Sequence, residues 1–248
     1  MEFSETDGVR WLSARLPGAQ AAFTTRLGGV STGAYEALNL GLFTGDEPGP
    51  VIENRGRLAR ALDRDPDGFL LGHQAHGAEI QERDEAPAPN PYLEPSTRPA
   101  EADGQVTSAV GLTVLVQVAD CLPVAVAGRH GVAMLHCGWR GLAAGIIERG
   151  AEAVEAQAAA IGPGIGRCCY EVGEEVLERF ADLGDGIAAG RMLDLPQIAR
   201  RLLERAGVSD VEVAEICTSC EPELFYSHRR DGAATGRQAG LAWLMDDA

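Results

Sequence analysis

Two apolar runs of strand length, residues 113–118 and 122–127, stand almost end to end in the middle of the chain. Short apolar runs bounded by turn residues are typical of buried strands rather than helices. Asp120 and Cys121 lie between the two runs. Polar residues beside tight turns at the ends of buried strands often carry chemistry, so this pair marks a candidate site.

A third apolar run, residues 132–135, leads directly into His136 and a Gly-Trp-Arg-Gly turn that ends at Gly141. The Ala-rich stretch that follows predicts a long helix over residues 142–160. Strands placed in this way can bring Cys121 and His136 together. Such a pair is either part of a metal site or a nucleophile with its base.

Strands and helices alternate only in part along the chain, which favours mixed sheets with helices over a regular Rossmann arrangement. Further strands are predicted at residues 9–12, 20–25, 69–71, 78–81, 211–216 and 238–244. Further helices are predicted at residues 51–62, 174–182 and 196–206, the last with Asp194 as its cap and Pro196 in its first turn. The five prolines of residues 84–100 predict an irregular excursion, a flap or loop rather than a domain linker.

The composition is that of an ordinary globular protein. A length of 248 residues allows one large domain or two small ones, and the hydrophobic content of 45% is typical. No apolar run approaches the roughly 20 residues that a membrane span requires. The chain starts with an acidic segment that lacks an apolar signal region, so we expect a cytoplasmic protein whose six cysteines are reduced.

The formal net charge of -16 argues against nucleic acid as a partner, because phosphate contacts need a basic surface. All 21 residues in the Lys and Arg total are arginine, which excludes a Walker A loop, a Schiff-base enzyme and a lysine general base. Arginines in glycine-bounded turns are the candidates for binding an anion, because a guanidinium pairs with phosphate in a fork. They are Arg26, Arg140, Arg229, Arg230 and Arg237.

Catalytic zinc sites usually have three protein ligands and an open fourth position. His76 lies in the turn Gly72-His-Gln-Ala-His-Gly77, and together with Cys121 and His136 it could supply such a set. Cys121 could instead be a nucleophile activated by either histidine, or a buried thiol that only fills space.

The remaining cysteines form a second pattern. Cys217 and Cys220 have the CxxC spacing, which is found in half zinc sites and in redox pairs. Cys168 and Cys169 could complete a four-thiolate site with them, although an incidental pattern without chemistry is the simpler interpretation.

Short motifs follow one another from about residue 20 to residue 245. They are Thr25-Arg-Leu-Gly-Gly-Val-Ser31, Leu38-Asn-Leu-Gly41, Gln74-Ala-His-Gly77, Ala102-Asp-Gly104, Ala119-Asp-Cys-Leu-Pro123, His136-Cys-Gly-Trp-Arg-Gly141, Ile161-Gly-Pro-Gly-Ile165, Cys169-Tyr-Glu-Val172 and Ser227-His-Arg-Arg-Asp-Gly232. Together they resemble the YfiH-like family. Its members have been described as polyphenol oxidases or multicopper laccase-type proteins, and later as purine nucleoside phosphorylases with adenosine deaminase activity. Cys137 and His228 depart from the family pattern, which usually has Ala and an aromatic residue there.

The resemblance implies an α+β fold, a single layered α-β-β-α domain with mixed sheets over residues 1–248. This domain would be similar to the catalytic domain of cytotoxic necrotizing factor toxins. The resemblance also implies zinc held by His76, Cys121 and His136, with copper as the alternative. The substrates would be phosphate and a purine nucleoside (adenosine, inosine, guanosine or methylthioadenosine), and adenosine would also be deaminated.

Hypothetical roles for single residues follow from these implications. Phosphate would be held by Arg26, Arg140 and Arg230, because phosphorolysis needs phosphate fixed against the sugar. The nucleoside would be oriented by Asn39 and Gln74. Asp120 would act within the catalytic group by steadying a metal ligand.

Three rival functions stay open. A copper-dependent polyphenol oxidase is hard to build from five histidines, because multicopper sites need many. A Cys–His hydrolase or amidase would use Cys121 as the nucleophile. A non-enzymatic, partner-binding protein would hold the metal structurally. Neither a membrane nor nucleic acid is expected as a partner, and the sequence makes no prediction of the oligomeric state.

Overall fold

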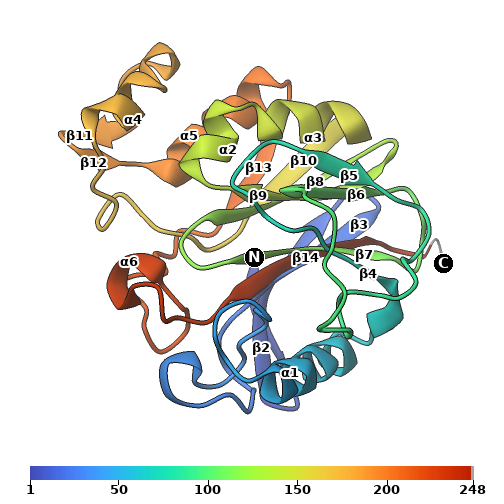
Figure 1. Cartoon of the computed structure of the whole chain (residues 1–248). Helices are drawn as coiled ribbons and strands as arrows, with labels where there is room; N and C mark the ends of the chain where they lie inside the picture. Colours follow the sequence, from blue (N-terminus) through green and yellow to red (C-terminus); the bar gives the residue numbers. More distant parts are fainter. Residues whose placement is uncertain (247–248) are drawn as a thin grey trace.

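In the computed structural model, which describes residues 1–246, two six-stranded sheets pack face to face (Figure 1). The first sheet has the order β1 (Glu2–Thr6), β2 (Val9–Leu16), β3 (Ala19–Thr24), β14 (Gln238–Leu244), β7 (Thr113–Val118) and β4 (Phe69–Leu70). The second sheet has the order β13 (Asp210–Val213), β10 (Ala156–Ile161), β8 (Leu122–Gly128), β9 (Gly131–Cys137), β6 (Gly104–Thr107) and β5 (Ile80–Glu82). The β4–β7, β5–β6 and β10–β13 pairs are parallel and the others antiparallel, so both sheets are mixed, as predicted.

Helices cover the outer faces of the sheets (Figure 1). The second sheet is covered by α2 (Trp139–Ala143), α3 (Ile146–Val154) and α5 (Leu195–Arg205), and the first by α1 (Pro48–Ala61). Smaller elements are α4 (Glu174–Glu178), α6 (His228–Asp231) and the hairpin of β11 (Ala188–Ala189) and β12 (Met192–Leu193). Short 3-10 helices span residues 33–35, 66–68 and 181–183. Among residues 1–246, none of the helices is long and apolar enough to cross a lipid bilayer.

The side chains of β7 illustrate why the sheets are layered in this way. Val114, Val116 and Val118 point into the core between the two sheets, whereas Leu115 packs on the outer face with the residues around α1. Successive side chains of a strand point to opposite faces, and here both faces are covered. A continuous apolar run is therefore the expected sequence of this strand.

The long helix predicted over residues 142–160 is wrong in its last part. α3 ends before Glu155, which adopts a left-handed conformation with φ of 47°, and β10 follows. Ala158 and Ala160 face the core between the sheets, and Ala159 faces the helices. β10 pairs with β8 on one side and with β13 on the other, and its core positions are buried. These contacts override the helix propensity of alanine, which is a weak preference.

Other predicted boundaries agree with the structure or differ for a simple reason. The C-terminal strand has the predicted bounds, and Asp194 caps α5 by accepting a hydrogen bond of 3.1 Å from the Gln197 N–H. The strand β1 was not predicted from the sequence. Its residues are almost all exposed, so they lack the apolar face that indicates a strand.

The proline-rich segment of residues 84–100 contains no helix or strand but is anchored at its middle. The Tyr92 ring is completely buried, with its centroid 4.4 Å from that of Phe69. The Tyr92 hydroxyl also donates a hydrogen bond of 3.0 Å to the Arg55 carbonyl oxygen in α1. These contacts fasten the predicted irregular excursion to the outer layer of the first sheet.

A small residue is required where β14 faces the second sheet. A Cβ atom on Gly240 would lie 2.4 Å from Pro123 Cβ and 2.9 Å from Met134 Sδ. Gly240→Ala should therefore lower the free energy of unfolding by about 1–3 kcal/mol, the usual cost of overpacking a core. Gly49→Ala is the matched control, because nothing lies within 4 Å of its added Cβ. Urea denaturation measures both variants, and equal stabilities would contradict the close approach of the sheets.

Candidate metal centre

Three predicted ligands come together where β8 begins and β9 ends. Cys121 immediately precedes β8, and His136 lies on β9 opposite Pro123 of β8. His76 comes from the turn that follows β4. The ligand atoms of His76, Cys121 and His136 lie within 4.8 Å of one another, and the two imidazole centroids are 4.8 Å apart.

The buried carboxylate of Asp103 connects the two histidine-bearing segments. It accepts hydrogen bonds from the backbone N–H groups of Ala75, His76 and Gly77, at 3.1, 3.0 and 2.7 Å. It also lies 2.7 Å from His136 Nδ1. This contact leaves Nε2 as the ring nitrogen that His136 can offer to a metal, an arrangement common around metal-binding histidines.

Unusual backbone conformations and one glycine help to position the three candidate ligands. His76 and Asp120 have positive φ angles of 62° and 89°. Such conformations are uncommon outside glycine and are maintained where the surroundings impose them, often at functional sites. Gly138 is needed for a different reason, since a Cβ there would lie 2.9 Å from Cys121 Sγ and 3.4 Å from His76 Cδ2.

The thiol and the imidazoles shift each other's protonation. Burial raises the pKa of Cys121, but the charge and hydrogen bonds of His136 and His76 outweigh burial and lower this pKa to about 6. Burial lowers the pKa of His136, whereas Cys121 and Asp103 raise it to about 9. Without a metal, the pair is therefore a thiolate beside an imidazolium near neutral pH. The thiolate is the form of cysteine that binds metals and attacks as a nucleophile.

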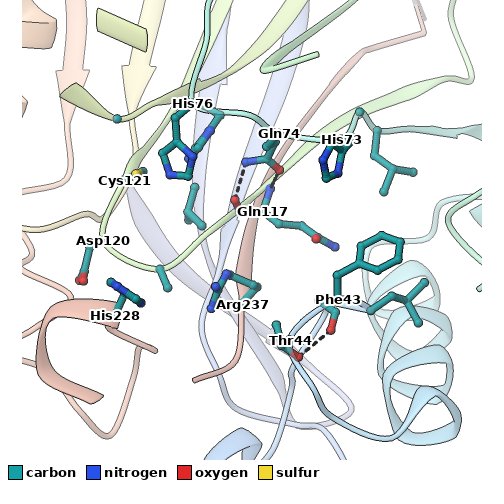
Figure 2. A pocket seen from close by; sticks show the side chains of 18 of the residues that line it. Phe43, Thr44, His73, Gln74, His76, Gln117, Asp120, Cys121, His228 and Arg237 are labelled. Atoms are coloured by element: carbon teal, nitrogen blue, oxygen red, sulfur yellow. Dashed lines mark hydrogen bonds between the residues drawn. The ribbon is translucent and has the colours of Figure 1, made fainter. Parts of the chain in front are cut away.

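A cavity of about 490 Å³ opens beside the three ligands. Its size lies within the range of small-molecule sites, about 300–1,000 Å³. Figure 2 shows His76 and Cys121 toward one end of the cavity, Phe43 and His73 toward the other, and Arg237 between them. The structure thus places His76, rather than His73, beside the thiol.

Three arginines with exposed or half-buried side chains line this cavity: Arg140, Arg229 and Arg237. The Arg140 guanidinium lies over the Trp139 ring, 4.5 Å from its centroid, and makes no hydrogen bond or ion pair within residues 1–246. Arg237 donates hydrogen bonds of 2.9 Å to two carbonyl oxygens of its own loop. Arg229 donates a bond of 2.9 Å to the Glu171 carbonyl oxygen.

Gln74 and Asp120 line the cavity, but their polar atoms are bonded to the protein. The Gln74 amide pairs with the backbone of Gln117, donating to its oxygen at 2.7 Å and accepting from its N–H at 2.8 Å. The Asp120 carboxylate accepts bonds from Thr218 Oγ1 at 2.7 Å and from the Arg229 N–H at 2.6 Å. Both residues therefore fasten loops around the three candidate ligands.

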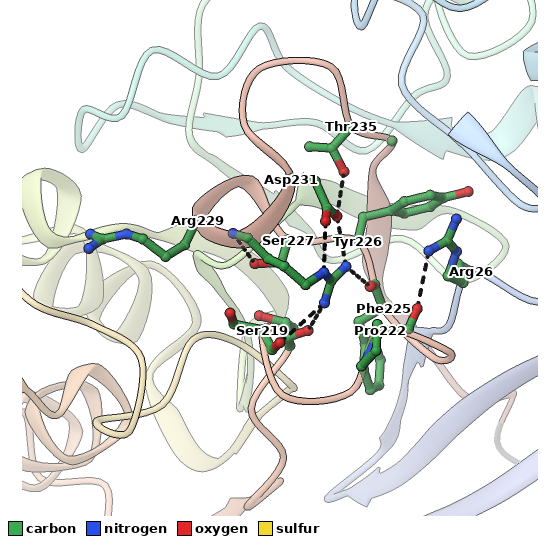
Figure 3. A network of polar contacts seen from close by, with 12 residues as sticks. Arg26, Ser219, Pro222, Phe225, Tyr226, Ser227, Arg229, Asp231 and Thr235 are labelled. Carbon is green, nitrogen blue, oxygen red and sulfur yellow. Dashed lines mark hydrogen bonds and ion pairs between the residues drawn. The ribbon is translucent and has the colours of Figure 1, made fainter. Parts of the chain in front are cut away.

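Arg26 and Asn39 do not line the cavity. Arg26 stacks over Tyr226 and donates a hydrogen bond of 3.1 Å to the Pro222 carbonyl oxygen, as Figure 3 shows. Asn39 is completely buried and donates a hydrogen bond of 2.9 Å to Asp46 Oδ2. These contacts are structural, so the predicted roles of both residues toward phosphate and nucleoside have no support in their positions.

Arg230 also lies away from the cavity, in the polar network of Figure 3. Its guanidinium donates to the carbonyl oxygens of Thr218, Ser219 and Phe225 and forms an ion pair of 2.7 Å with Asp231. Because its guanidinium is bonded to these partners, Arg230 holds the C-terminal loops together. The structure does not bring it to a position for binding phosphate in the cavity.

Sequence reasoning gave no role to two residues that organise the site. Asp103 lies in the motif Ala102-Asp-Gly104, but only the folded chain shows that its carboxylate reaches a turn 26 residues away. Gln117 is the penultimate residue of β7, inside the run that the sequence predicts as an apolar strand. The sequence signal for Gln117 is a polar residue in an otherwise apolar strand. The backbone N–H of Gln117 donates a hydrogen bond that fixes the Gln74 side chain.

Comparison with known proteins shows the family of this chain. Residues 20–245 match a family model described as "Multi-copper polyphenol oxidoreductase laccase". The chain belongs to this family. The YfiH-like resemblance is confirmed by a relative from Escherichia coli (strain K12) named "Purine nucleoside phosphorylase YfiH", which is 37% identical over 92% of this chain and 95% of its own length. A Deinococcus radiodurans relative named "Purine nucleoside phosphorylase" is 41% identical over 90% of this chain and 88% of its own.

Solved structures of YfiH-like proteins have the same fold. The Bacillus licheniformis hypothetical protein YfiH superposes with a TM-score of 0.88 at 30% identity and covers 98% of this chain and 99% of its own. YlmD from Geobacillus stearothermophilus superposes with a TM-score of 0.87 at 34% identity and covers 98% of both chains. The mixed α+β fold is therefore shared along nearly the whole length of these YfiH-like chains.

The lowered pKa of Cys121 is open to a direct test on metal-free protein. Its rate of alkylation by iodoacetamide should rise with pH around a midpoint of about 6, because the thiolate reacts and the thiol does not. Site-resolved mass spectrometry separates Cys121 from the other cysteines. Cys137, whose pKa burial raises, serves as the unreactive internal control. A Cys121 midpoint near the ordinary value of about 8.5 would contradict the thiolate–imidazolium pair.

Proposed function

We propose that the chain is a zinc-dependent purine nucleoside phosphorylase that also deaminates adenosine. The observation that carries this proposal is the convergence of His76, Cys121 and His136 beside a cavity that arginines also line. Two relatives are named as purine nucleoside phosphorylases, which supports phosphate and a purine nucleoside as substrates. Adenosine, inosine, guanosine and methylthioadenosine are the proposed nucleosides.

The three residues fit zinc better than a multicopper centre. Two imidazoles and a thiolate with space on the cavity side match a catalytic zinc site, which keeps one position open. Within residues 1–246, no group of converging Cys, His or carboxylate ligands contains more than two histidines. A multicopper cluster needs more, so the laccase description of the family model is the weaker guide. When bound, zinc supplies Lewis acidity that activates water near neutral pH, which is the chemistry of deamination.

Phosphorolysis requires a phosphate held against the sugar while the purine leaves. Arg140 and Arg237 line the cavity with guanidinium groups that can pair with phosphate oxygens. Held in this way, the phosphate needs no further loss of rotational freedom before it reacts. We assign phosphate binding to these two residues in place of Arg26 and Arg230.

Aromatic side chains on the cavity wall can receive the purine ring. Phe43, Trp139 and Tyr170 all line the cavity, and Phe43 has 66% of its surface exposed. An exposed aromatic ring at a cavity edge offers a stacking surface for a flat base. Figure 2 shows Phe43 on the side of the cavity away from Cys121, so its ring offers the purine a surface at that end.

A Cys–His hydrolase is the second candidate, and one observation favours it. Asp103, His136 and Cys121 form a chain in which the carboxylate orients the imidazole and the imidazole faces the thiol. This is the arrangement of a nucleophile, a base and an orienting group. The two functions differ in their need for a metal, because a cysteine nucleophile works without one.

Chelation of the purified chain separates these functions. We expect wild-type protein to release hypoxanthine from inosine in the presence of phosphate, and a strong chelator to abolish this activity. Re-addition of zinc should restore it. Cys121→Ala should bind less zinc and stay inactive after zinc is added, because a thiolate ligand is missing.

Two results of this experiment would contradict the proposed function. Hydrolase activity on an ester or amide substrate that survives chelation, but not Cys121→Ala, would favour the cysteine nucleophile. A zinc-loaded chain that releases no base from any of the four nucleosides would overturn the proposed phosphorylase function.

Substitution of Arg140 tests the assignment of phosphate binding. Arg140→Ala should lower kcat/KM for phosphate by about 10- to 100-fold, because a hydrogen bond to a charged group contributes about 1.5–3 kcal/mol. The KM for inosine should change less. Arg129→Ala is the matched control, since its exposed side chain lies outside the cavity. Equal phosphate kinetics in both variants would refute this role for Arg140.

A further inference from the structure

We propose that Cys168, Cys169, Cys217 and Cys220 bind a second zinc ion as a structural four-thiolate site. The four Sγ atoms lie within 4.8 Å of one another, although the two pairs are about 50 residues apart in the sequence. This site is separate from the His76 group and does not depend on the proposed nucleoside chemistry.

The sulfur positions are close to those of a tetrahedral zinc site. Sulfurs at about 2.3 Å from a zinc ion occupy tetrahedral corners roughly 3.8 Å apart. Cys220 Sγ lies 3.5 Å from Cys168 Sγ and 3.4 Å from Cys169 Sγ. These separations are far above the length of a disulfide bond, about 2.05 Å, and all four residues are free thiols.

Two adjacent turns present the four thiols. The Cys169 N–H donates to the Gly166 carbonyl oxygen at 3.0 Å, and the Cys220 N–H donates to the Cys217 carbonyl oxygen at 3.1 Å. A parallel bridge between Gly164 and Cys217 holds the turns side by side. The sulfurs therefore converge because backbone bonds fix both turns, which prepares the site for a metal.

A backbone hydrogen bond and the close approach of the two turns at Gly166 favour thiolates at this position. The Gly166 N–H donates a hydrogen bond of 3.3 Å to Cys217 Sγ, and a hydrogen bond of this kind stabilises a thiolate. A Cβ on Gly166 would lie 3.3 Å from Cys217 Cβ and 3.5 Å from Cys168 Sγ. The absence of a side chain at Gly166 therefore allows the two turns to approach each other.

The chemistry of the donor set selects the metal. Four thiolates favour zinc or another soft cation, whereas magnesium and calcium prefer oxygen ligands. A site with four protein ligands has no open position, so its role is structural. Each thiol that binds releases a proton, because the thiolate is the ligand.

The turns that would be joined by this zinc also form part of the cavity wall. Tyr170, next to Cys169, lines the cavity. Thr218, next to Cys217, donates the 2.7 Å hydrogen bond to Asp120 Oδ1. Figure 3 shows Ser219 within the network of the C-terminal loops, where its carbonyl oxygen accepts a bond from Arg230. Zinc at this position would therefore stiffen the cavity wall beside the Cys121 loop without touching the substrate.

Metal titration of the reduced, metal-free full chain tests the proposal. We expect two zinc equivalents per wild-type chain and one in Cys220→Ser, which keeps the His76 group intact. With cobalt in place of zinc, thiolate-to-metal absorption should be intense in wild type and should persist in His76→Ala. Ser219→Ala is the matched control in the same turn and should bind two equivalents.

Other results would overturn the proposal. One is an unchanged zinc stoichiometry in Cys220→Ser. Another is cobalt absorption that disappears in His76→Ala, which would assign all thiolate ligation to Cys121. A third is mass spectrometry showing disulfides among the four cysteines in protein purified without reductant and loaded with zinc, since oxidised sulfurs do not bind zinc. If Cys220→Ser fails to fold, the cobalt absorption of His76→Ala alone decides, because its persistence supports the four-thiolate site and its loss overturns it.

Discussion

The hydrogen bonds of the Asp103 carboxylate hold both histidines of the candidate metal centre in place. Three backbone N–H groups of the His76 turn and the His136 imidazole share one buried carboxylate, which has 1% of its surface exposed. Hydrogen bonds to an ionised acceptor are stronger than neutral ones, and the buried carboxylate would be costly to leave unpaired. These bonds lower the pKa of Asp103 against the opposing effect of burial, so the carboxylate stays charged.

The layered sheets place this carboxylate and the three ligands. Asp103 precedes β6, the neighbour of β9, and β9 in turn pairs with β8. Asp103, His136 and Cys121 therefore occupy one end of three adjacent strands. The His76 turn is fastened to the first sheet as well, through the pairing of Gln74 with Gln117. The site thus lies where the two sheets are joined, and the cavity opens beside this junction.

The sequence predicted those parts of the fold and site that local patterns encode. Apolar runs gave the strands that became β7, β8 and β9, and the motifs indicated which Cys and His residues meet. Long-range contacts were not encoded locally. The alanines of β10 have the composition of a helix, and only their burial between two strands makes them a strand. Arg230 has the charge to bind phosphate, but its guanidinium donates to carbonyl groups of the loop 11 and 12 residues before it.

The zinc affinity of Asp103→Asn tests most directly whether this carboxylate assembles the metal centre. Competition with a chromophoric chelator measures it, with Asp84→Asn as the control. Asp84 accepts a backbone hydrogen bond of 2.7 Å from Ser108 and lies outside the cavity. Loss of such a partner around a metal ligand usually costs about 10- to 100-fold in affinity, and we predict that range for Asp103→Asn alone. An affinity equal to that of wild type would contradict the central role of Asp103.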